Sequence, residues 1–198
     1  MTEMSPDVID VTLDENWTLY SDGSSSLQGS GLGILLQSPT GEILEQSLWL
    51  QFKASSNEAE YEALLAGLRL AKGLGARQIK AFCDSQLVVS QFSGEFEAKN
   101  ERMRAYLSLV HELSSQFHQF ALVKIPRNDN SAADALAALA SSANPDLRRT
   151  IPVESIAKPS IEPPNSTCVI VDPVTAMDID GNAINAPGIE EDPEPSDW

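Results

Sequence analysis

The sequence has few cysteines, little positive charge and no long hydrophobic run. Its 198 residues include only two cysteines, Cys83 and Cys168, which are too few for a disulfide framework or a cysteine-rich zinc site. No stretch approaches the roughly 20 apolar residues that a membrane span needs. The acidic start MTEMSPDVID lacks the basic and apolar parts of a signal peptide. We therefore expect an intracellular protein, cytoplasmic or nuclear, that is neither secreted nor bound to a membrane.

Charge and proline are distributed unevenly along the chain. Lysine and arginine total 13 against 29 aspartates and glutamates, so the formal net charge is −16. Residues 1–15 carry −5 and residues 16–142 carry −3, whereas residues 143–198 carry −8 and nine of the twelve prolines. Proline removes backbone donors and like charges repel, so this last segment buries too little surface to offset its ordering entropy. The sequence predicts an acidic leader, one folded domain at 16–142, and a mainly disordered acidic linker in which only 167–171 resembles a strand.

Hydrophobic periodicity divides residues 16–142 into strands and helices. Alternating or continuous apolar segments predict strands at 17–22, 31–37, 43–52, 79–83 and 120–125. Apolar residues at three- and four-residue steps predict helices at 57–73, 85–91, 103–117 and 130–140. The order βββαβααβα, in which helices link the later strands, predicts an α/β fold with a mixed five-stranded sheet flanked by helices.

Four carboxylates lie at the ends of these elements, and each has an ordinary structural explanation. Asp22 begins an Asp-Gly pair, which commonly forms a turn and would end the first strand. Glu60 stands three residues after Asn57, which is the spacing of a capping box. Asp84 could cap the helix that follows it, although Ser85 could do so equally well. Asp134 would lie in the first turn of the last helix, where the macrodipole favours a negative charge.

Taken together, the four carboxylates favour a different interpretation. If the first and fourth strands are neighbours, Asp22 and Asp84 lie side by side at the carboxyl edge of the sheet, where ligands gather in such folds. Glu60 and Asp134 would then project from helices packed over the same edge. Clustered carboxylates repel one another and are stable only with cations. Oxygen ligands alone select a hard ion, Mg²⁺ or Mn²⁺, and two such ions about 4 Å apart are the arrangement used for in-line attack on phosphodiesters.

Four segments resemble the motifs of type 1 ribonuclease H. They are YSDGS at 20–24, NEAEYEAL at 57–64, CDSQLV at 83–88 and NSAADALA at 130–137, in the order of that family. More narrowly, the domain is similar to the ribonuclease H portion of the polyproteins of plant gypsy-class long-terminal-repeat retrotransposons. In those polyproteins this portion follows a reverse transcriptase and is joined to an integrase by a tether, which the acidic, proline-rich tail resembles.

The resemblance implies an endoribonuclease that cuts the RNA strand of an RNA–DNA hybrid with two Mg²⁺ ions, or with Mn²⁺. It implies that Asp22, Glu60, Asp84 and Asp134 are the catalytic metal ligands. It also implies a set of substrate-binding residues: Gly23, Ser24, Asn57, Gln86, Arg127 and Asn130. The implied partners, besides the hybrid, are the reverse transcriptase and integrase modules of a parent polyprotein.

The sequence departs from the family in two respects. Better-studied members carry a histidine before the final helix that is thought to assist product release, and this chain has Arg127 in that loop, so we expect slower turnover. Some members also grip the hybrid with a basic segment, whereas residues 91–104 contain three acids and three bases. We therefore expect weak binding by the isolated domain. The alternative is a non-catalytic relic or nucleic-acid-binding module with the same fold.

Overall fold

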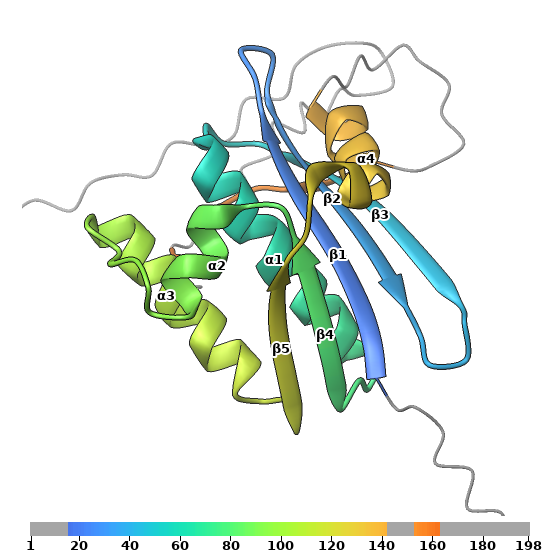
Figure 1. Ribbon diagram of the computed structural model, residues 1–198. Coiled ribbons are helices and arrows are strands. Elements are labelled where there is room, and N and C mark those ends of the chain that lie inside the picture. The colour runs from blue at the N-terminus through green and yellow to red at the C-terminus, as the bar shows by residue number, and fades with distance from the viewer. Residues whose placement is uncertain (1–15, 142–152, 163–198) are drawn as a thin grey trace, which may run out of the picture. The chain divides into compact units, whose positions relative to one another are not determined.

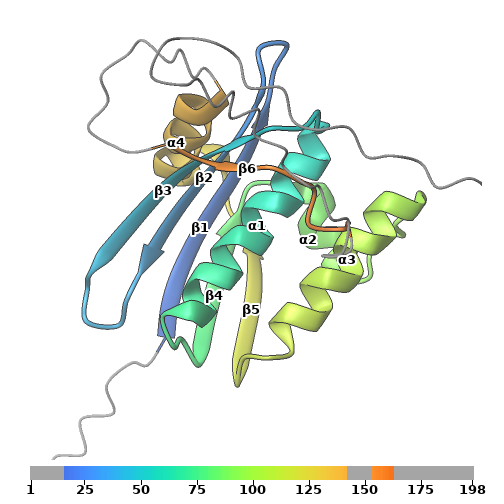
Figure 2. The same ribbon diagram turned by 180° about the vertical axis from the view of Figure 1, so that it is seen from behind.

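The computed structural model describes residues 16–141 and 153–162 (Figures 1 and 2). The chain divides into two units, residues 1–163 and 164–198, and every described residue lies in the first. The acidic leader and the predicted strand at 167–171 fall outside the described residues. In the part of the chain that is described, no helix has the length and apolar character needed to cross a bilayer.

Within the described residues, six strands form a single mixed sheet in the order β5-β4-β1-β2-β3-β6. The strands are β1 (Asn16–Ser25), β2 (Ser30–Gln37), β3 (Ile43–Leu50), β4 (Gln78–Cys83), β5 (Gln119–Lys124) and β6 (Val153–Ile156). β1, β2 and β3 form an antiparallel meander, while β4 pairs in parallel with β1 and β5 in parallel with β4. The predicted α/β fold with a mixed sheet is confirmed, and the first and fourth strands are neighbours.

The sheet has one strand more than the five predicted. β6 pairs in parallel with Ser47–Leu50 of β3, inside the segment that composition predicts to be disordered. That prediction is wrong for residues 153–162, and the folded part of the chain extends beyond residue 142. A four-residue strand in a proline-rich, acidic background carries too little periodicity to be detected from sequence.

The first strand also differs from the prediction. β1 does not end in a turn at Asp22, because it continues to Ser25 and Asp22 pairs with Gly33 of β2. The turn lies further on, where the backbone N–H of Ser26 donates to the carbonyl of Gly29. The turn explanation for Asp22 therefore does not apply.

The described residues also contain four α-helices: α1 (Ser56–Gly73), α2 (Gln86–Phe92), α3 (Glu101–Ser114) and α4 (Ser131–Ser141). α1 is capped by Ser55, which forms a complete capping box with Glu58, so Glu60 has no capping role. α2 is capped by the Ser85 hydroxyl and not by Asp84. For both carboxylates, the local structural explanation is wrong.

The helices cover the sheet on two faces, with α1 and α3 on one side and α4 on the other (Figures 1 and 2). Between the sheet and α1 lies a core of buried leucine, isoleucine and alanine side chains. On the opposite face α4 sits directly on β2, because a Cβ atom at Gly33 would overlap the backbone of Ala133 and Ala137. The Ser47 hydroxyl of β3 also donates to the carbonyl of Leu136 at 2.7 Å. These contacts fix the start of α4, and with it Asp134, over the meander.

Candidate active site

Three of the four predicted carboxylates come together at the carboxyl edge of β1 and β4. Asp22, Glu60 and Asp84 each offer one oxygen, and these oxygens lie within 4.8 Å of one another. The parallel pairing of β1 with β4 reaches Tyr20 and Phe82, so Asp22 and Asp84 stand two residues beyond equivalent points of neighbouring strands. Glu60 reaches the same place from the first turns of α1.

Gly23 allows Glu60 to approach Asp22. A Cβ atom at Gly23 would overlap the backbone of Ala59 and Glu60, so the first turns of α1 lie directly against β1 at this position. The backbone N–H of Gly23 also hydrogen-bonds the carboxylate of Glu60, which lowers its pKa in part. The structure thus places Gly23 against α1 as a packing and hydrogen-bonding position for Glu60, whereas the sequence motif implied a substrate contact.

Burial and mutual repulsion make the cluster hold protons strongly. The pKa of Glu60 is raised to about 8, first by burial and then by the charges of Asp22 and Asp84. The pKa of Asp22 is raised to about 7, first by burial and then by Asp84 and Asp134. Among the described residues, no group hydrogen-bonds the buried Oε2 atom of Glu60. A buried carboxylate oxygen without a partner, beside two further carboxylates, is the setting in which a cation is bound.

Asp134 lies at the margin of this cluster. It stands in the first turn of α4 and is not one of the three carboxylates whose oxygens converge. Its Oδ1 atom accepts a hydrogen bond of 2.8 Å from the exposed guanidinium of Arg127. The charge of Asp134 nevertheless contributes to the raised pKa of Asp22, and Arg127 acts in the opposite direction. Arg127 is therefore a positive charge at the edge of a negative site.

Asn130 orients Asp84 through a hydrogen bond from its side-chain amide. It is buried, with 1% of its surface exposed, and it ends the short 3-10 turn Arg127–Asn130 before α4. Its Nδ2 atom donates to the carbonyl of Ser21 at 3.0 Å and to Oδ1 of Asp84 at 3.4 Å. The sequence implied a substrate contact for Asn130, but this burial makes it a positioning residue for the cluster.

Comparison with known proteins assigns the chain to a family. The sequence profile described as "Reverse transcriptase-like" matches residues 20–140, more than half of the chain. The chain belongs to this reverse transcriptase-like family. A ribonuclease HI of Halobacterium salinarum is 33% identical over 120 residues, which cover 60% of this chain and 60% of the relative. A bifunctional protein of Mycobacterium tuberculosis is 33% identical over 124 residues, 59% of this chain and 34% of the relative. The chain thus spans less than two thirds of these curated relatives.

Solved structures show that this member of the reverse transcriptase-like family has the ribonuclease H fold. The crystal structure of RNase H1 from Halobacterium salinarum matches with a TM-score of 0.60 at 33% identity, covering 63% of this chain and 96% of that one. The N-terminal RNase H domain of a Mycobacterium tuberculosis protein matches with a TM-score of 0.58 at 32% identity, covering 64% and 99%. A third structure, of LC11-RNase H1 in complex with an RNA/DNA hybrid, has a TM-score of 0.57 at 25% identity and covers 63% and 95%.

Three other residues that the motifs implied as substrate contacts lie on β1, α1 and α2 of this reverse transcriptase-like domain. Ser24 is half-buried on β1, directly after Gly23. Asn57 is exposed in the first turn of α1. Gln86 is exposed at the start of α2, where its amide donates to the Ser90 hydroxyl at 2.7 Å. Ser24, Asn57 and Gln86 thus remain accessible to a ligand, which Asn130 does not.

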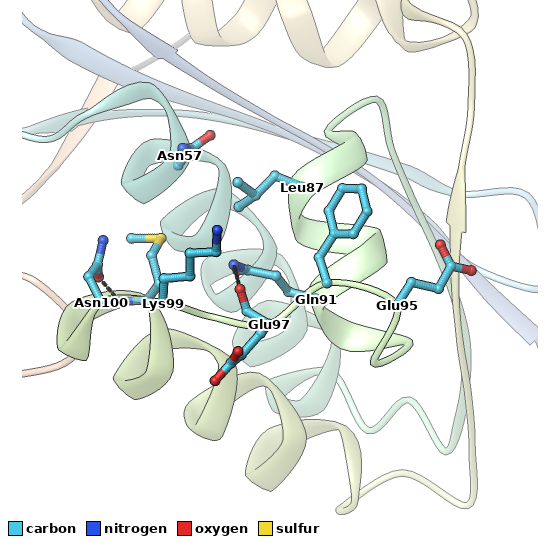
Figure 3. A pocket seen from close by; sticks show the side chains of 9 residues that line it. Asn57, Leu87, Gln91, Glu95, Glu97, Lys99 and Asn100 are labelled. Atoms are coloured by element: carbon cyan, nitrogen blue, oxygen red, sulfur yellow. Dashed lines mark hydrogen bonds between the residues drawn. The ribbon is translucent and has the colours of Figure 1, made fainter.

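A cavity of about 440 Å³ lies among the starts of α1, α2 and α3 and the segment 93–100 (Figure 3). Asn57 and Leu87 line it, and Gln91 donates from its amide to the Glu97 carbonyl at 3.4 Å (dashed in Figure 3). The charged side chains of its lining are two acids, Glu95 and Glu97, and one base, Lys99. This cavity therefore offers little electrostatic attraction to a nucleic-acid backbone.

The raised pKa values predict how the stability of the metal-free protein depends on pH. In the unfolded chain these two carboxyls titrate near 3.8 and 4.5, and in the folded chain near 7 for Asp22 and 8 for Glu60. The folded state therefore binds more protons across this window, so the free energy of unfolding falls as pH rises through it. Thermal unfolding in a chelating buffer should show a melting temperature that decreases from about pH 5 to about pH 8, and Asp22→Asn should flatten the decrease. A melting temperature that rises over the same range would contradict the clustering.

Proposed function

We propose that this domain is a metal-dependent endoribonuclease that cleaves the RNA strand of RNA–DNA hybrids. The observation that carries the proposal is the convergence of Asp22, Glu60 and Asp84 at one sheet edge, with an unpartnered buried oxygen on Glu60. Two relatives support it by what their names state: one is a ribonuclease HI, and the structure of another holds an RNA/DNA hybrid.

The residues of the cluster fit a divalent cation. Their donors are carboxylate oxygens only, which suit hard ions such as Mg²⁺ or Mn²⁺. Asp22, Glu60 and Asp84 would hold the first ion, and Asp134 would complete the ligands of a second. When bound, such a pair supplies an activated water and stabilises the leaving oxygen of an in-line displacement.

The chain's own residues would position these ligands and the substrate. Gly23 holds Glu60 by packing and by its N–H, and Asn130 holds Asp84 through its side-chain amide. Arg127 is exposed beside Asp134, where its charge would attract the phosphate backbone.

Substrate selection would depend on the exposed polar residues around the cluster. We propose that Ser24, Asn57 and Gln86 contact the minor groove of the hybrid, since all three are at least partly exposed. A 2′-hydroxyl both donates and accepts hydrogen bonds, so contacts to it would distinguish the RNA strand from DNA.

A cleavage assay tests the proposed function directly. The purified chain is incubated with an RNA–DNA hybrid, duplex RNA or duplex DNA, each with Mg²⁺, with Mn²⁺ or with a chelator. We expect cleavage of the hybrid alone, confined to its RNA strand and dependent on the ion. Intact hybrid at high enzyme concentration in both ions would reject the catalytic proposal and favour the non-catalytic module.

Metal binding should stabilise the folded chain whether or not it cleaves RNA. A ligand that binds only the folded state adds to the free energy of unfolding, by about 2.7 kcal/mol at a concentration 100 times its dissociation constant. We expect Mg²⁺ to raise the melting temperature by several degrees, and Asp84→Asn to lose most of this increase. An equal increase in both proteins would place the bound ion elsewhere on the chain.

We also infer that the domain comes from a retroelement polyprotein and acts inside the cell, in the cytoplasm or nucleus. The four motifs and the acidic, proline-rich tail support this origin. Because the folded part carries no excess of positive charge, a fused reverse transcriptase would deliver the hybrid that the domain binds poorly, and an integrase would follow. Cleavage by a fusion of the domain with such a polymerase should therefore need less enzyme than cleavage by the domain alone.

A further inference from the structure

A second acidic side chain of α1, Glu62, is fully buried outside the carboxylate cluster. It has 0% of its surface exposed, and the hydroxyl of Tyr106 on α3 donates to its Oε1 atom at 2.8 Å. The other donors found among the described residues come from Ser160, whose backbone N–H lies 2.6 Å from Oε1 and whose hydroxyl lies 2.6 Å from Oε2. A buried carboxylate is stable only when such donors surround it. Most of the described hydrogen bonding of Glu62 therefore depends on a residue 98 positions further along the chain.

Ser160 belongs to the segment 153–162, which contacts the domain at several further points. β6 at its start pairs with the edge of β3. The Gln51 backbone N–H donates to the carbonyl of Ile156 at 2.9 Å, and the Gln51 side chain donates to the Ser155 hydroxyl at 2.8 Å. Ile156 and Ile161 pack against the hydrophobic core. The segment passes over α1 and ends beside α3 (Figure 2), and Arg69 of α1 donates to the Ser160 hydroxyl at 2.7 Å.

We propose that residues 153–162 form a strap that docks on β3 and α1 of its own chain and holds the first half of α1 in place. Glu62, which the strap binds, and Glu60, which belongs to the cluster, are two residues apart on the same helix. Without Ser160, the Tyr106 hydroxyl would be the one donor left to Glu62 among the described residues. The carboxylate of Glu62 would then move toward water to replace its lost hydrogen bonds. That movement would carry the first turns of α1, and with them Glu60, away from Asp22. The strap therefore helps to keep Glu60 beside Asp22. This inference does not depend on the proposed nuclease activity.

Two serine-to-aspartate substitutions, which add the same charge, test whether the strap holds α1 in place or only touches it. Ser160→Asp places a carboxylate against the buried Glu62, whereas Ser155→Asp places one where the Gln51 side chain can still donate to it. Hydrogen–deuterium exchange is measured on the full metal-free chain, resolved into peptides. In Ser160→Asp we expect exchange to accelerate by about tenfold or more in residues 153–162 and also in residues 56–62. Ser155→Asp should exchange like the unmodified chain in both segments.

A second variant shows whether the effect passes through Glu62. Glu62→Gln combined with Ser160→Asp replaces the repelling pair with an amide that can donate to the new carboxylate, so protection should return in both segments. Three results would overturn the proposal: no protection of residues 153–162 in the unmodified chain, faster exchange in the strap with none in residues 56–62, or protection that appears only in a concentration-dependent dimer. The last result would mean that the strap docks on a second copy.

Discussion

Asp84→Asn is expected to reduce cleavage of the RNA–DNA hybrid by about a thousandfold or more, the upper part of the range for removing one preorganised electrostatic group from an active site. Asp84 is one of the three carboxylates that converge, and the amide that replaces it carries no charge to hold a cation. The same change should make the metal-free protein more stable above neutral pH, since the charge of Asp84 contributes to the raised pKa values of both Asp22 and Glu60. Single-turnover cleavage rates and chemical denaturation measure the two effects.

Asp129→Asn is the matched control for this substitution. Asp129 is exposed in the short turn before α4, outside the cluster. Its replacement by asparagine therefore makes the same change of charge and shape as Asp84→Asn. It should leave both the cleavage rate and the stability of the metal-free protein close to those of the original chain. If the two variants lose activity equally, net charge and not the cluster determines cleavage. If Asp84→Asn cleaves normally, the reacting phosphate lies elsewhere.

The second large effect is expected from a single methyl group, in Gly23→Ala. The added Cβ atom would overlap backbone atoms of Ala59 and Glu60. Backbone atoms cannot relieve an overlap by changing rotamer, as a side chain can. The first turns of α1 must then move away from β1, at a cost of about 1–3 kcal/mol or more for overpacking. Because this movement separates Glu60 from Asp22, cleavage should fall far more than stability does. Urea denaturation and cleavage rates at saturating Mg²⁺ compare the two losses.

Gly73→Ala provides the comparison at the other end of the same helix. A Cβ atom at Gly73 meets nothing within 4 Å, and replacing glycine by alanine in a helix gains up to about 1 kcal/mol. This variant should therefore be as active as the original chain and equally or more stable. A Gly23→Ala protein with normal stability and normal cleavage would show that α1 tolerates displacement at this point, and the account of how Glu60 is placed would fail.

Much of the fold follows from local pattern, because each long element repeats its signal several times. The apolar period of α1 extends over five turns, and the meander alternates over three strands, so their existence and order could be predicted. The neighbouring positions of β1 and β4 could be stated only as a condition, since the sequence gives no direct measure of which strands pair. β6 could not be predicted, because its four residues carry no sign of their pairing with β3 or of the contact that Ser160, four residues after the strand, makes with Glu62.

In the candidate site, too, some features could be predicted from local pattern and others depend on distant contacts. The motif residues Asp22, Glu60 and Asp84 could be named from sequence, but the roles of Gly23 and Asn130 depend on contacts with distant segments. Asn130 donates to a carbonyl 109 positions away, and a pattern of residues cannot report such a partner. The placement of Asp134 with Arg127 beside the cluster likewise depends on how α4 is seated on β2, which the alanines of α4 favour only in a general way.

The position of β6 has a practical consequence for expression of the protein. The match to the reverse transcriptase-like family stops at residue 140, so a fragment designed on that boundary would omit β6. Such a fragment would leave the backbone N–H and carbonyl groups of β3 without their neighbouring strand, and an unpaired sheet edge readily adds a strand from another molecule. Fragments that end at 140 should therefore self-associate on concentration, whereas those extended through residue 162 should stay monodisperse.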